Sequence, residues 1–282
     1  PLSEAEAAVL KRLAGRKLVH PDMPARLRMN LPDWAFAGLE ARFGAGLADE
    51  AAAMEGAAPL DLRANMLRTT REAAIAALAA EGIAAVPTPF SPWGMRVADR
   101  RPVSGTEAFK AGLIEVQDEG SQLIALLADA QPGMRVADYC AGAAGKTLAM
   151  AATMENRGHI VACDVSSSRL DGAVRRLRRA GVHNAERHLL SAGDKWRKRN
   201  ARKFDRVLVD APCTGSGTWR RNPDARIRTR AQDLTELAAK QAMILDHASE
   251  LVRPGGRLVY ATCSLLPEED EQQMQAFLQR HP

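Results

Sequence analysis

From Gly133 onward the sequence repeats one pattern: a short apolar run, then a turn of small residues, then a segment with helical character. Alternation of buried strands with helices is typical of a parallel sheet that is covered by helices on both faces. The runs predicted as strands are 134–138, 159–163, 204–210 and 257–262, with another strand and turn near 188–194. Helices are predicted over 148–154 and 233–251, and an apolar helix over 122–127 precedes the first of these strands. We therefore predict an α/β fold over residues 109–282, wound in the Rossmann-like manner.

Two other regions precede this domain. Residues 1–58 are predicted to be helical, because Ser3 and Glu6 match a capping box, Pro32 suits a first helical turn, and an alanine-rich piece runs to Gly56. The sequence does not decide whether this region is an extension that only packs or whether it binds a partner. Residues 59–108 are predicted to form a small α+β domain, with a strand over 60–66, a helix capped by Thr69 and Glu72, and a strand over 83–86. RNA contact by this domain is also left open.

Composition excludes several classes of protein. No run approaches the roughly 18 apolar residues that a membrane span needs. The four cysteines include no C-x-x-C pair and the six histidines no ligand spacing, so we expect no disulfide, no structural zinc and no other metal. The first residues lack a basic segment followed by an apolar one, so we expect no signal peptide and a cytoplasmic location.

The charge of the chain is positive and clustered. Its formal net charge is +5 and its isoelectric point is about 9.2. Clustered cations suit a phosphate-rich polymer, although such runs also serve as solvated faces. Trp196 and Trp219 lie within these runs and could stack on bases or simply pack. The clustered residues are Arg175, Arg176, Arg178, Arg179, Lys195, Arg197, Lys198, Arg199, Arg220, Arg221, Arg226, Arg228 and Arg230.

Two acids end successive predicted strands beside a turn of small residues. Asp138 precedes the turn 140–147, and Asp164 ends the next strand, where a carboxylate can bind a ribose diol. The turn matches neither G-x-x-x-x-G-K-[ST] nor G-x-G-x-x-G, the patterns that cradle diphosphates. This combination favours an adenosine ligand with a positive centre, such as S-adenosylmethionine. Both acids could instead be helix caps.

Two thiols follow strands in the same half. Cys213 comes after the run 204–210, which ends in Asp210, and Cys263 comes after the run 257–262. Carbon 5 of a pyrimidine becomes nucleophilic toward a sulfonium methyl group once a thiolate adds to carbon 6. One thiol would make that addition and a second group would assist release, while Asp210 could hold the amine and ring nitrogen of cytosine. Cys140 and Cys163 are expected to be small buried fillers.

The segments 210–224, which begins Asp-Ala-Pro-Cys-Thr-Gly, and 260–269, Tyr-Ala-Thr-Cys-Ser-Leu-Leu-Pro-Glu-Glu, resemble the two signature motifs of the RNA cytosine-5 methyltransferases. This family includes the bacterial Sun/Fmu ribosomal RNA enzymes. The resemblance implies a class I methyltransferase domain in which Cys263 is the nucleophile and Cys213 assists release. Related DNA enzymes use the cysteine of the Pro-Cys motif instead. The catalytic residues implied are thus Cys263, Cys213 and Asp210.

The donor turn also resembles that of the family, which usually reads Asp-x-Cys-Ala-Ala-Pro-Gly-Gly-Lys-Thr. Here it reads Asp-Tyr-Cys-Ala-Gly-Ala-Ala-Gly-Lys-Thr, without the proline and one glycine. Family members normally continue into closing strands beyond the point where this sequence stops. The residues expected to bind the cofactor are Asp138, Cys140, Ala141, Gly142, Gly145, Lys146, Asp164, Asp194 and Asp210.

The resemblance implies a monomer that methylates carbon 5 of cytosine in RNA with S-adenosylmethionine. Ribosomal RNA is the favoured substrate and transfer RNA a second candidate. Two alternatives remain at this stage. The chain could be a non-catalytic RNA-binding or ribosome-assembly factor that keeps the methyltransferase scaffold. The altered donor turn supports this alternative. It could also be a DNA-directed enzyme with Cys213 as nucleophile.

Overall fold

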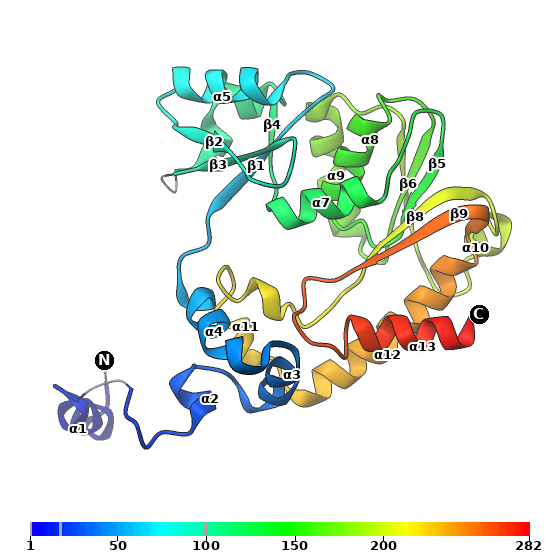
Figure 1. The fold of residues 1–282 in the computed structure, drawn as a ribbon. Coiled ribbons are helices and arrows are strands. Elements are labelled where there is room, and N and C mark those ends of the chain that lie inside the picture. The colour runs from blue at the N-terminus through cyan, green and yellow to red at the C-terminus, as the bar shows by residue number, and fades with distance from the viewer. Residues whose placement is uncertain (1, 17–18, 99–100) are drawn as a thin grey trace.

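The computed structural model describes residues 2–16, 19–98 and 101–282. Figure 1 shows three parts: helices at the N-terminus, a small sheet above them, and a larger sheet toward the C-terminus. In the residues described, none of the helices combines the length and the apolar character that crossing a bilayer requires.

The larger sheet confirms the predicted α/β, Rossmann-like fold. Its neighbours all pair in parallel, in the order β7-β6-β5-β8-β9. The chain therefore winds outward in both directions from the middle of the sheet, which leaves a crevice at the carboxyl ends of β5 and its neighbours. The strands are β5 (Arg135–Asp138), β6 (His159–Asp164), β7 (Ala185–Leu189), β8 (Phe204–Asp210) and β9 (Val252–Ala261). β7 lies a few residues before the predicted position, so 190–194 form the loop after it.

Both faces of this sheet are covered. Side chains alternate along a strand, and in β8 Val207 and Val209 join one apolar cluster while Leu208 joins another. The first cluster includes residues of α12, and the second includes residues of α7 and α8. An uninterrupted apolar strand is thus explained by burial on both sides. The helices are α7 (Glu119–Leu127), α8 (Gly145–Thr153), α9 (Ser167–Ala180), α10 (Trp196–Arg199), α12 (Ala231–Ser249) and α13 (Glu271–Arg280).

The small sheet has four strands in the order β2-β3-β1-β4, and every pair is antiparallel. With two helices the unit runs strand-helix-strand twice over, which is the ferredoxin-like pattern. The sequence predicted only the first half of this unit, up to β2, and did not predict β3 or β4. The elements are β1 (Leu60–Ala64), α5 (Arg71–Ala80), β2 (Ala85–Pro87), β3 (Gly94–Val97), α6 (Glu107–Lys110) and β4 (Ile114–Val116).

The limits of this unit differ from the expectation in two places. β4 pairs with β1, so the boundary expected at residue 108 falls inside the unit, and we propose to draw it after β4. Thr70, not Thr69, caps α5, since its Oγ1 accepts the N–H of Ala73 at 3.1 Å. The two threonines are adjacent, but Thr70 is the extended residue that directly precedes the helix.

The N-terminal helices pack against the C-terminal half of the chain. The predicted capping box of Ser3 and Glu6 is present at α1, while Pro32 precedes α3 as its N-cap and does not lie in its first turn. Apolar residues of α3 and α4 share one cluster with Trp219 and Leu266, which lie in the two thiol motifs a few residues after each cysteine. The region is therefore built onto the larger domain. The helices are α1 (Glu4–Leu13), α2 (Ala25–Arg28), α3 (Asp33–Phe43) and α4 (Leu47–Glu55), and α11 (Ala225–Arg228) lies beside them (Figure 1).

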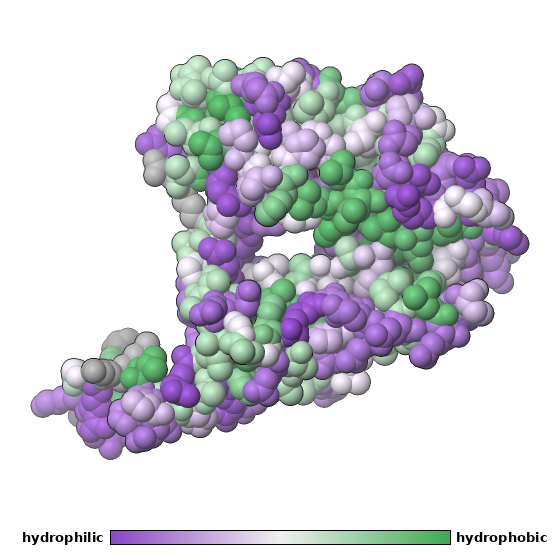
Figure 2. All heavy atoms as spheres, viewed as in Figure 1, coloured by the Kyte–Doolittle hydropathy of each residue, from purple (hydrophilic) through white to green (hydrophobic). Residues whose placement is uncertain are grey.

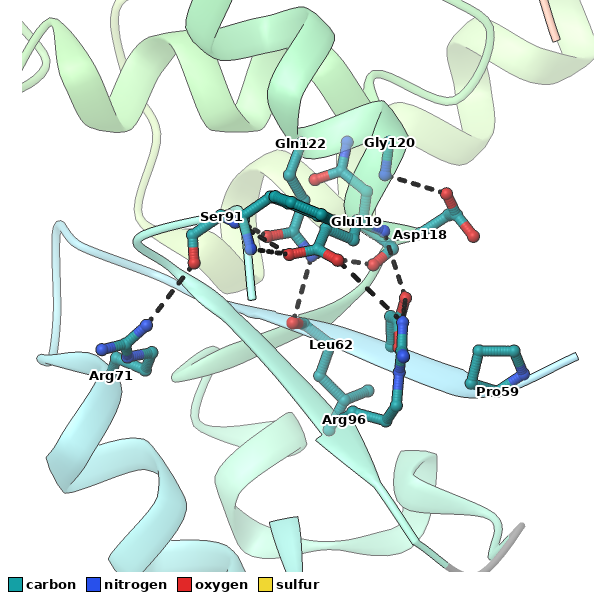
Figure 3. A network of polar contacts seen from close by, with 12 residues as sticks. Pro59, Leu62, Arg71, Ser91, Arg96, Asp118, Glu119, Gly120 and Gln122 are labelled. Carbon is teal, nitrogen blue, oxygen red and sulfur yellow. Dashed lines mark hydrogen bonds and ion pairs between the residues drawn. The ribbon is translucent and has the colours of Figure 1, made fainter. Parts of the chain in front are cut away.

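A polar network joins the small sheet to the start of α7 (Figure 3). Glu119 accepts the N–H groups of Phe90 and Ser91 at 2.7 and 2.8 Å. Gln122, completely buried, donates to the carbonyl oxygen of Leu62 at 3.2 Å and accepts the hydroxyl of Ser91 at 2.7 Å. Arg96 bonds both oxygens of the buried Asp61. The N–H of Glu119 donates to Asp61 at 3.3 Å, so this contact and those of Glu119 and Gln122 with Phe90, Ser91 and Leu62 hold the small sheet against α7.

A hollow separates the upper and lower parts of the molecule in the space-filling view (Figure 2). The small sheet and α7 lie above it, and the segments that follow β8 and β9 run along its lower border (Figure 1). The thiol motifs belong to these two segments.

Candidate active site

A pocket of about 830 Å³ opens at the carboxyl ends of β5, β6 and β8. This is where a doubly wound sheet places its ligand. Every residue that the sequence predicted for cofactor binding lines it: Asp138, Cys140, Ala141, Gly142, Gly145, Lys146, Asp164, Asp194 and Asp210.

Asp138 ends β5 and is completely buried. Its Oδ2 accepts the hydroxyl of Thr147 at 2.7 Å, whereas its Oδ1 has no hydrogen-bond partner among the described residues. Burial raises the pKa of Asp138 to about 6. A buried acceptor without a partner is costly unless a ligand supplies a donor, so this atom marks a ligand position.

Asp164 ends β6 and fixes the turn of small residues. Its Oδ2 accepts the N–H of Gly142 and its Oδ1 that of Ser166, both at 2.8 Å. Within the turn Gly142 and Ala144 have positive φ angles, 55° and 62°. Ala144 stands where the resembling family has glycine, and an alanine in this left-handed region costs about 1 kcal/mol. The turn therefore depends on contacts from outside itself.

Asp194 lies on the loop after β7, and its two oxygens are engaged by the protein. Oδ2 contacts Nε2 of His188 at 2.5 Å and Oδ1 accepts the N–H of Trp196 at 2.8 Å. The N–H of Trp196, followed by His188, lowers the pKa of Asp194. Contact with the adenine of a cofactor remains a prediction for this residue.

Lys146 and Asp210 pair across the pocket floor. Nζ of Lys146, in the first turn of α8, lies 2.5 Å from Oδ2 of Asp210 at the end of β8. The lysine side chain is nearly buried and the aspartate is partly open. Asp210 therefore borders both the pocket and the segment that carries Cys213.

The structure brings the two thiols together, with Sγ of Cys213 3.3 Å from Sγ of Cys263. Cys263 is exposed and Cys213 is half-buried. The hydrogen bond from Cys213 lowers the pKa of Cys263 in spite of burial, and the same bond raises the pKa of Cys213. Cys263 is therefore the more acidic thiol of the pair.

A buried carboxylate organises the segments that carry these thiols. Glu269, completely buried, accepts the N–H of Thr214 at 2.8 Å, the hydroxyl of the same residue, and Nε2 of Gln241 at 2.9 Å. The N–H of Gly217 donates to the carbonyl oxygen of Cys263 at 2.9 Å. The sequence did not identify Glu269 as part of the site, although it closes the second thiol motif.

Of the other two cysteines, only Cys163 agrees with the filler prediction, because Cys140 is partly exposed and lines the pocket. Cys163 is completely buried inside the sheet. Burial raises the pKa of Cys140 to about 12, which keeps it protonated. No group of three potential metal ligands occurs within the described ranges.

Two of the cations expected to face a polymer also donate hydrogen bonds to the linker that precedes the small sheet. Arg220 donates to the carbonyl oxygens of Gly56 and Ala57, and Arg221 to that of Pro59. These two arginines hold the connection between the N-terminal helices and the small sheet. Both side chains are nevertheless exposed, so these bonds are compatible with the predicted solvent-facing basic surface.

Both tryptophans of the basic runs pack within the protein. Trp219 is completely buried and meets Trp34 edge-on, with ring centroids 6.0 Å apart. Trp196 is buried and stacks on His188 at 4.7 Å. Neither ring is free to stack on a base, so the packing alternative is the correct one.

Part of the pocket wall was not predicted. Gln117 and Ser121 come from the junction between β4 and α7, Arg176 comes from α9, and Met243 and His247 come from α12. No local pattern marks these positions, since each reaches the pocket only through the packing of its element.

The comparisons with known proteins agree with this geometry. The family model described as 16S rRNA methyltransferase RsmB/F matches residues 125–282, more than half of the chain. The chain belongs to the RsmB/F family. A model described as the RsmF/B-like ferredoxin-like domain matches residues 31–104.

Individual relatives give the same result. The ribosomal RNA small subunit methyltransferase B of Salmonella newport is 36% identical over 229 residues, 79% of this chain and 52% of the relative. The chain thus spans about half the length of the curated relatives it matches. The crystal structure of a methyltransferase homolog from Pyrococcus horikoshii is 32% identical, covers 93% of this chain and 83% of its own, and has a TM-score of 0.80. NSun6 from the same organism, solved with SFG, shares the fold at 21% identity and a TM-score of 0.79, over 88% of this chain and 87% of its own.

These findings confirm the resemblance drawn from the motifs, the fold class, and S-adenosylmethionine as the cofactor. The pocket of this RsmB/F member fits that molecule. It has sufficient volume, an acid at the end of β6 for a ribose, and a turn of small residues that allows close approach. It also contains Oδ1 of Asp138, a buried acceptor without a hydrogen-bond donor among the described residues.

Proposed function

We propose that this chain transfers a methyl group from S-adenosylmethionine to carbon 5 of a cytosine in ribosomal RNA. The observation that carries the proposal is the contact of two unlike thiols, Cys263 and Cys213, beside a pocket that fits the cofactor. A methyltransferase acting on an oxygen or an exocyclic nitrogen has no use for such a pair, whereas carbon 5 requires a thiolate at carbon 6.

The bound cofactor supplies an electrophilic methyl group. The thiolate of Cys263 adds to carbon 6 of the cytosine, and carbon 5, now electron-rich, takes the methyl group. Solvent water then takes the proton on carbon 5, the electron pair of that bond restores the double bond between carbons 5 and 6, and Cys263 leaves carbon 6 as a thiolate. At the start of the reaction Cys213 donates a hydrogen bond to the Cys263 thiolate. Once the Cys263 sulfur is bonded to carbon 6 of the cytosine, Cys213 is in place to assist its release.

Asp210 is placed to bind the target base. Its carboxylate borders the pocket and belongs to the segment that carries Cys213, and it pairs with Lys146. A carboxylate there can accept a hydrogen bond from the exocyclic amine of cytosine and so orient the base for the addition. The target base must leave any stack to reach this position.

The hollow between the two parts of the molecule supports an RNA substrate, because the thiol segments lie along its border (Figures 1 and 2). Lys195, which directly precedes α10, and Lys198 and Arg199 within that helix are exposed and add to the positive charge. Single-stranded or locally opened RNA is the form that such a site can engage.

The test is covalent trapping with RNA that contains 5-fluorocytosine, in the presence of S-adenosylmethionine. Fluorine at carbon 5 cannot leave as a proton does, so a working enzyme stops as a protein–RNA adduct. We expect the parent and Cys213→Ser to form the adduct and Cys263→Ser to lose it. Cys163→Ala is the matched control, since that thiol is buried away from the pair.

Three outcomes contradict the proposal. Adducts from Cys263→Ser but not from Cys213→Ser would reverse the roles and favour a DNA-type enzyme. No adduct on ribosomal RNA but an adduct on transfer RNA would change the substrate. No adduct on any RNA, with the cofactor still bound, would identify a non-catalytic RNA-binding or assembly factor.

A further inference from the structure

Arg176 touches the donor turn from outside it. Its Nη1 donates to the carbonyl oxygen of Ala143 at 2.8 Å, and both residues line the cofactor pocket. Arg176 belongs to α9, more than thirty residues along the chain, and was predicted only as part of a basic surface run.

The turn needs such a contact. Ala143 lies between Gly142 and Ala144, the two residues with positive φ. Glycine adopts this conformation freely, but Ala144 does not, so the local sequence alone does not favour the observed turn. A charge-assisted hydrogen bond to the carbonyl between them is worth more than a neutral one and opposes that strain.

Arg176 is itself held by the small sheet. Its Nη2 lies 3.2 Å from Oε2 of Glu115 on β4, and the Glu115 side chain is only 4% exposed. Arg179, one turn further along α9, pairs with the other oxygen of Glu115 and lies 3.6 Å above the ring of Phe109. The two arginines thus share one buried carboxylate, but only Arg176 has a hydrogen bond to the donor turn.

The same edge of the small sheet supplies pocket wall. Gln117 follows β4, lines the pocket, and accepts Nε of the buried Arg63 at 2.7 Å. Asp118 and Glu119 continue into the network that holds α7 on the sheet (Figure 3). The path from the sheet to the cofactor is therefore short and made of buried polar contacts.

We propose that Arg176 is a positioning residue for S-adenosylmethionine, which holds the carbonyl of Ala143 and, through Glu115, makes the small sheet part of the donor site. The proposal rests on the pocket's role as donor site and not on which RNA base is methylated. It gives the small sheet a task in cofactor binding besides any contact with RNA.

The experiment compares Arg176→Ala with Arg179→Ala in the full chain. Affinity for S-adenosylmethionine and for S-adenosylhomocysteine is measured by calorimetry, and thermal unfolding is recorded without ligand. We expect Arg176→Ala to weaken both affinities about tenfold or more. Arg179→Ala should lose at least as much thermal stability and keep its affinity within about twofold, because it leaves the turn untouched.

A rescue separates positioning from general damage. Ala144→Gly removes the left-handed strain, so in the Arg176→Ala background it should recover a large part of the lost affinity. In the parent the same change should have a smaller effect, since the turn is already held.

Equal affinity losses in the two arginine variants would overturn the proposal and point to loss of stability alone. A loss in Arg176→Ala that Ala144→Gly does not relieve would also overturn it, and would assign Arg176 direct contact with the donor. Because no RNA is present, these results are independent of the trapping experiment. If the parent trapped RNA as predicted but these affinities were unchanged, only the present proposal would fail.

Discussion

At the scale of single residues, the site depends on two chemically identical side chains that behave differently. Cys213 and Cys263 each lie within a few residues of a strand end, and only the resemblance of their motifs to the family gives them different roles. Their contact at 3.3 Å creates the difference, because one sulfur can hold a negative charge only if the other keeps its proton. Cys263, the more exposed of the two, has the lowered pKa.

This difference predicts a change in pH profile. Alkylation of Cys263 by iodoacetamide, followed by peptide mass analysis, reports its thiolate fraction. A lowered pKa means that the thiolate is already present below the usual range and is lost only as pH falls through the shifted value. Cys213→Ala removes the hydrogen bond that lowers the pKa, so we expect the profile of Cys263 to move to higher pH.

Cys163→Ala serves as the control for this measurement, since its sulfur lies inside the sheet and has no contact with the pair. Its profile should match that of the parent. A Cys263 profile that stays in place in Cys213→Ala would show that the lysine of the site, not the neighbouring thiol, sets the acidity.

At the scale of elements, the thiol contact depends on two irregular segments that pack closely. Gly217 lies in a short 3-10 turn after Cys213, and its N–H donates to the carbonyl oxygen of Cys263. A Cβ atom on Gly217 would lie 2.8 Å from that oxygen, a distance at which the backbone must move. Glu269 and Thr214 hold the same segments from the buried side.

Gly217→Ala should therefore separate the two segments. We expect a loss of about 1–3 kcal/mol in the free energy of unfolding, typical of an overpacked site. The yield of the RNA adduct should fall more than stability alone explains, because Cys263 is displaced from its partner. Chemical denaturation and the trapping assay measure the two effects.

Gly172→Ala is the matched control on α9. No atom lies within 4 Å of the added Cβ, and alanine favours a helix, so stability should rise by up to about 1 kcal/mol with trapping unchanged. If Gly217→Ala gave the same yield of RNA adduct as Gly172→Ala, the spacing of the two thiol segments would not be critical.

At the scale of the whole molecule, the three parts are joined by buried polar contacts and a shared apolar cluster. The N-terminal helices pack on Trp219 and Leu266, and the small sheet is held on α7 by Gln122 and Glu119. Leaving one partner of such a buried hydrogen bond unsatisfied costs folding free energy. We therefore expect the small sheet and the larger domain to unfold together.

Gln122→Leu tests this coupling. The change keeps the volume but leaves the hydroxyl of Ser91 and the carbonyl oxygens of Leu62 and Gln117 without the amide partner. We expect a loss of about 3 kcal/mol in the free energy of unfolding by urea, in a single transition. Gln232→Leu, at an exposed position of α12, should change it by less than about 0.5 kcal/mol.

Two transitions in the Gln122→Leu protein, or a loss no larger than that of the control, would contradict the coupling. The first result would make the small sheet an independent unit. The second would mean that water or neighbouring groups replace the lost partners.

Local patterns in the sequence predicted the strands of the larger sheet, β7 with a shift of a few residues, and part of the lining of the pocket at their carboxyl ends. The run 204–210 was predicted with the bounds that β8 has, and Asp138 and Asp164 were placed at strand ends. These are properties of contiguous residues: apolar runs, strand-end acids and turns of small residues repeat over short distances, and parallel strands bring their carboxyl ends to one edge. The family motifs added the roles of Cys213 and Cys263, which remain a proposal.

Only the tertiary structure decided which distant groups meet. Arg176 could not be told from its neighbours in a run of arginines until α9 was placed against the donor turn. Arg220 could not be assigned to the linker carbonyls until a segment more than 160 residues away was packed beside it. The physical reason is the same in each case: a hydrogen bond between distant residues depends on how whole elements pack, and short-range periodicity carries no record of that packing.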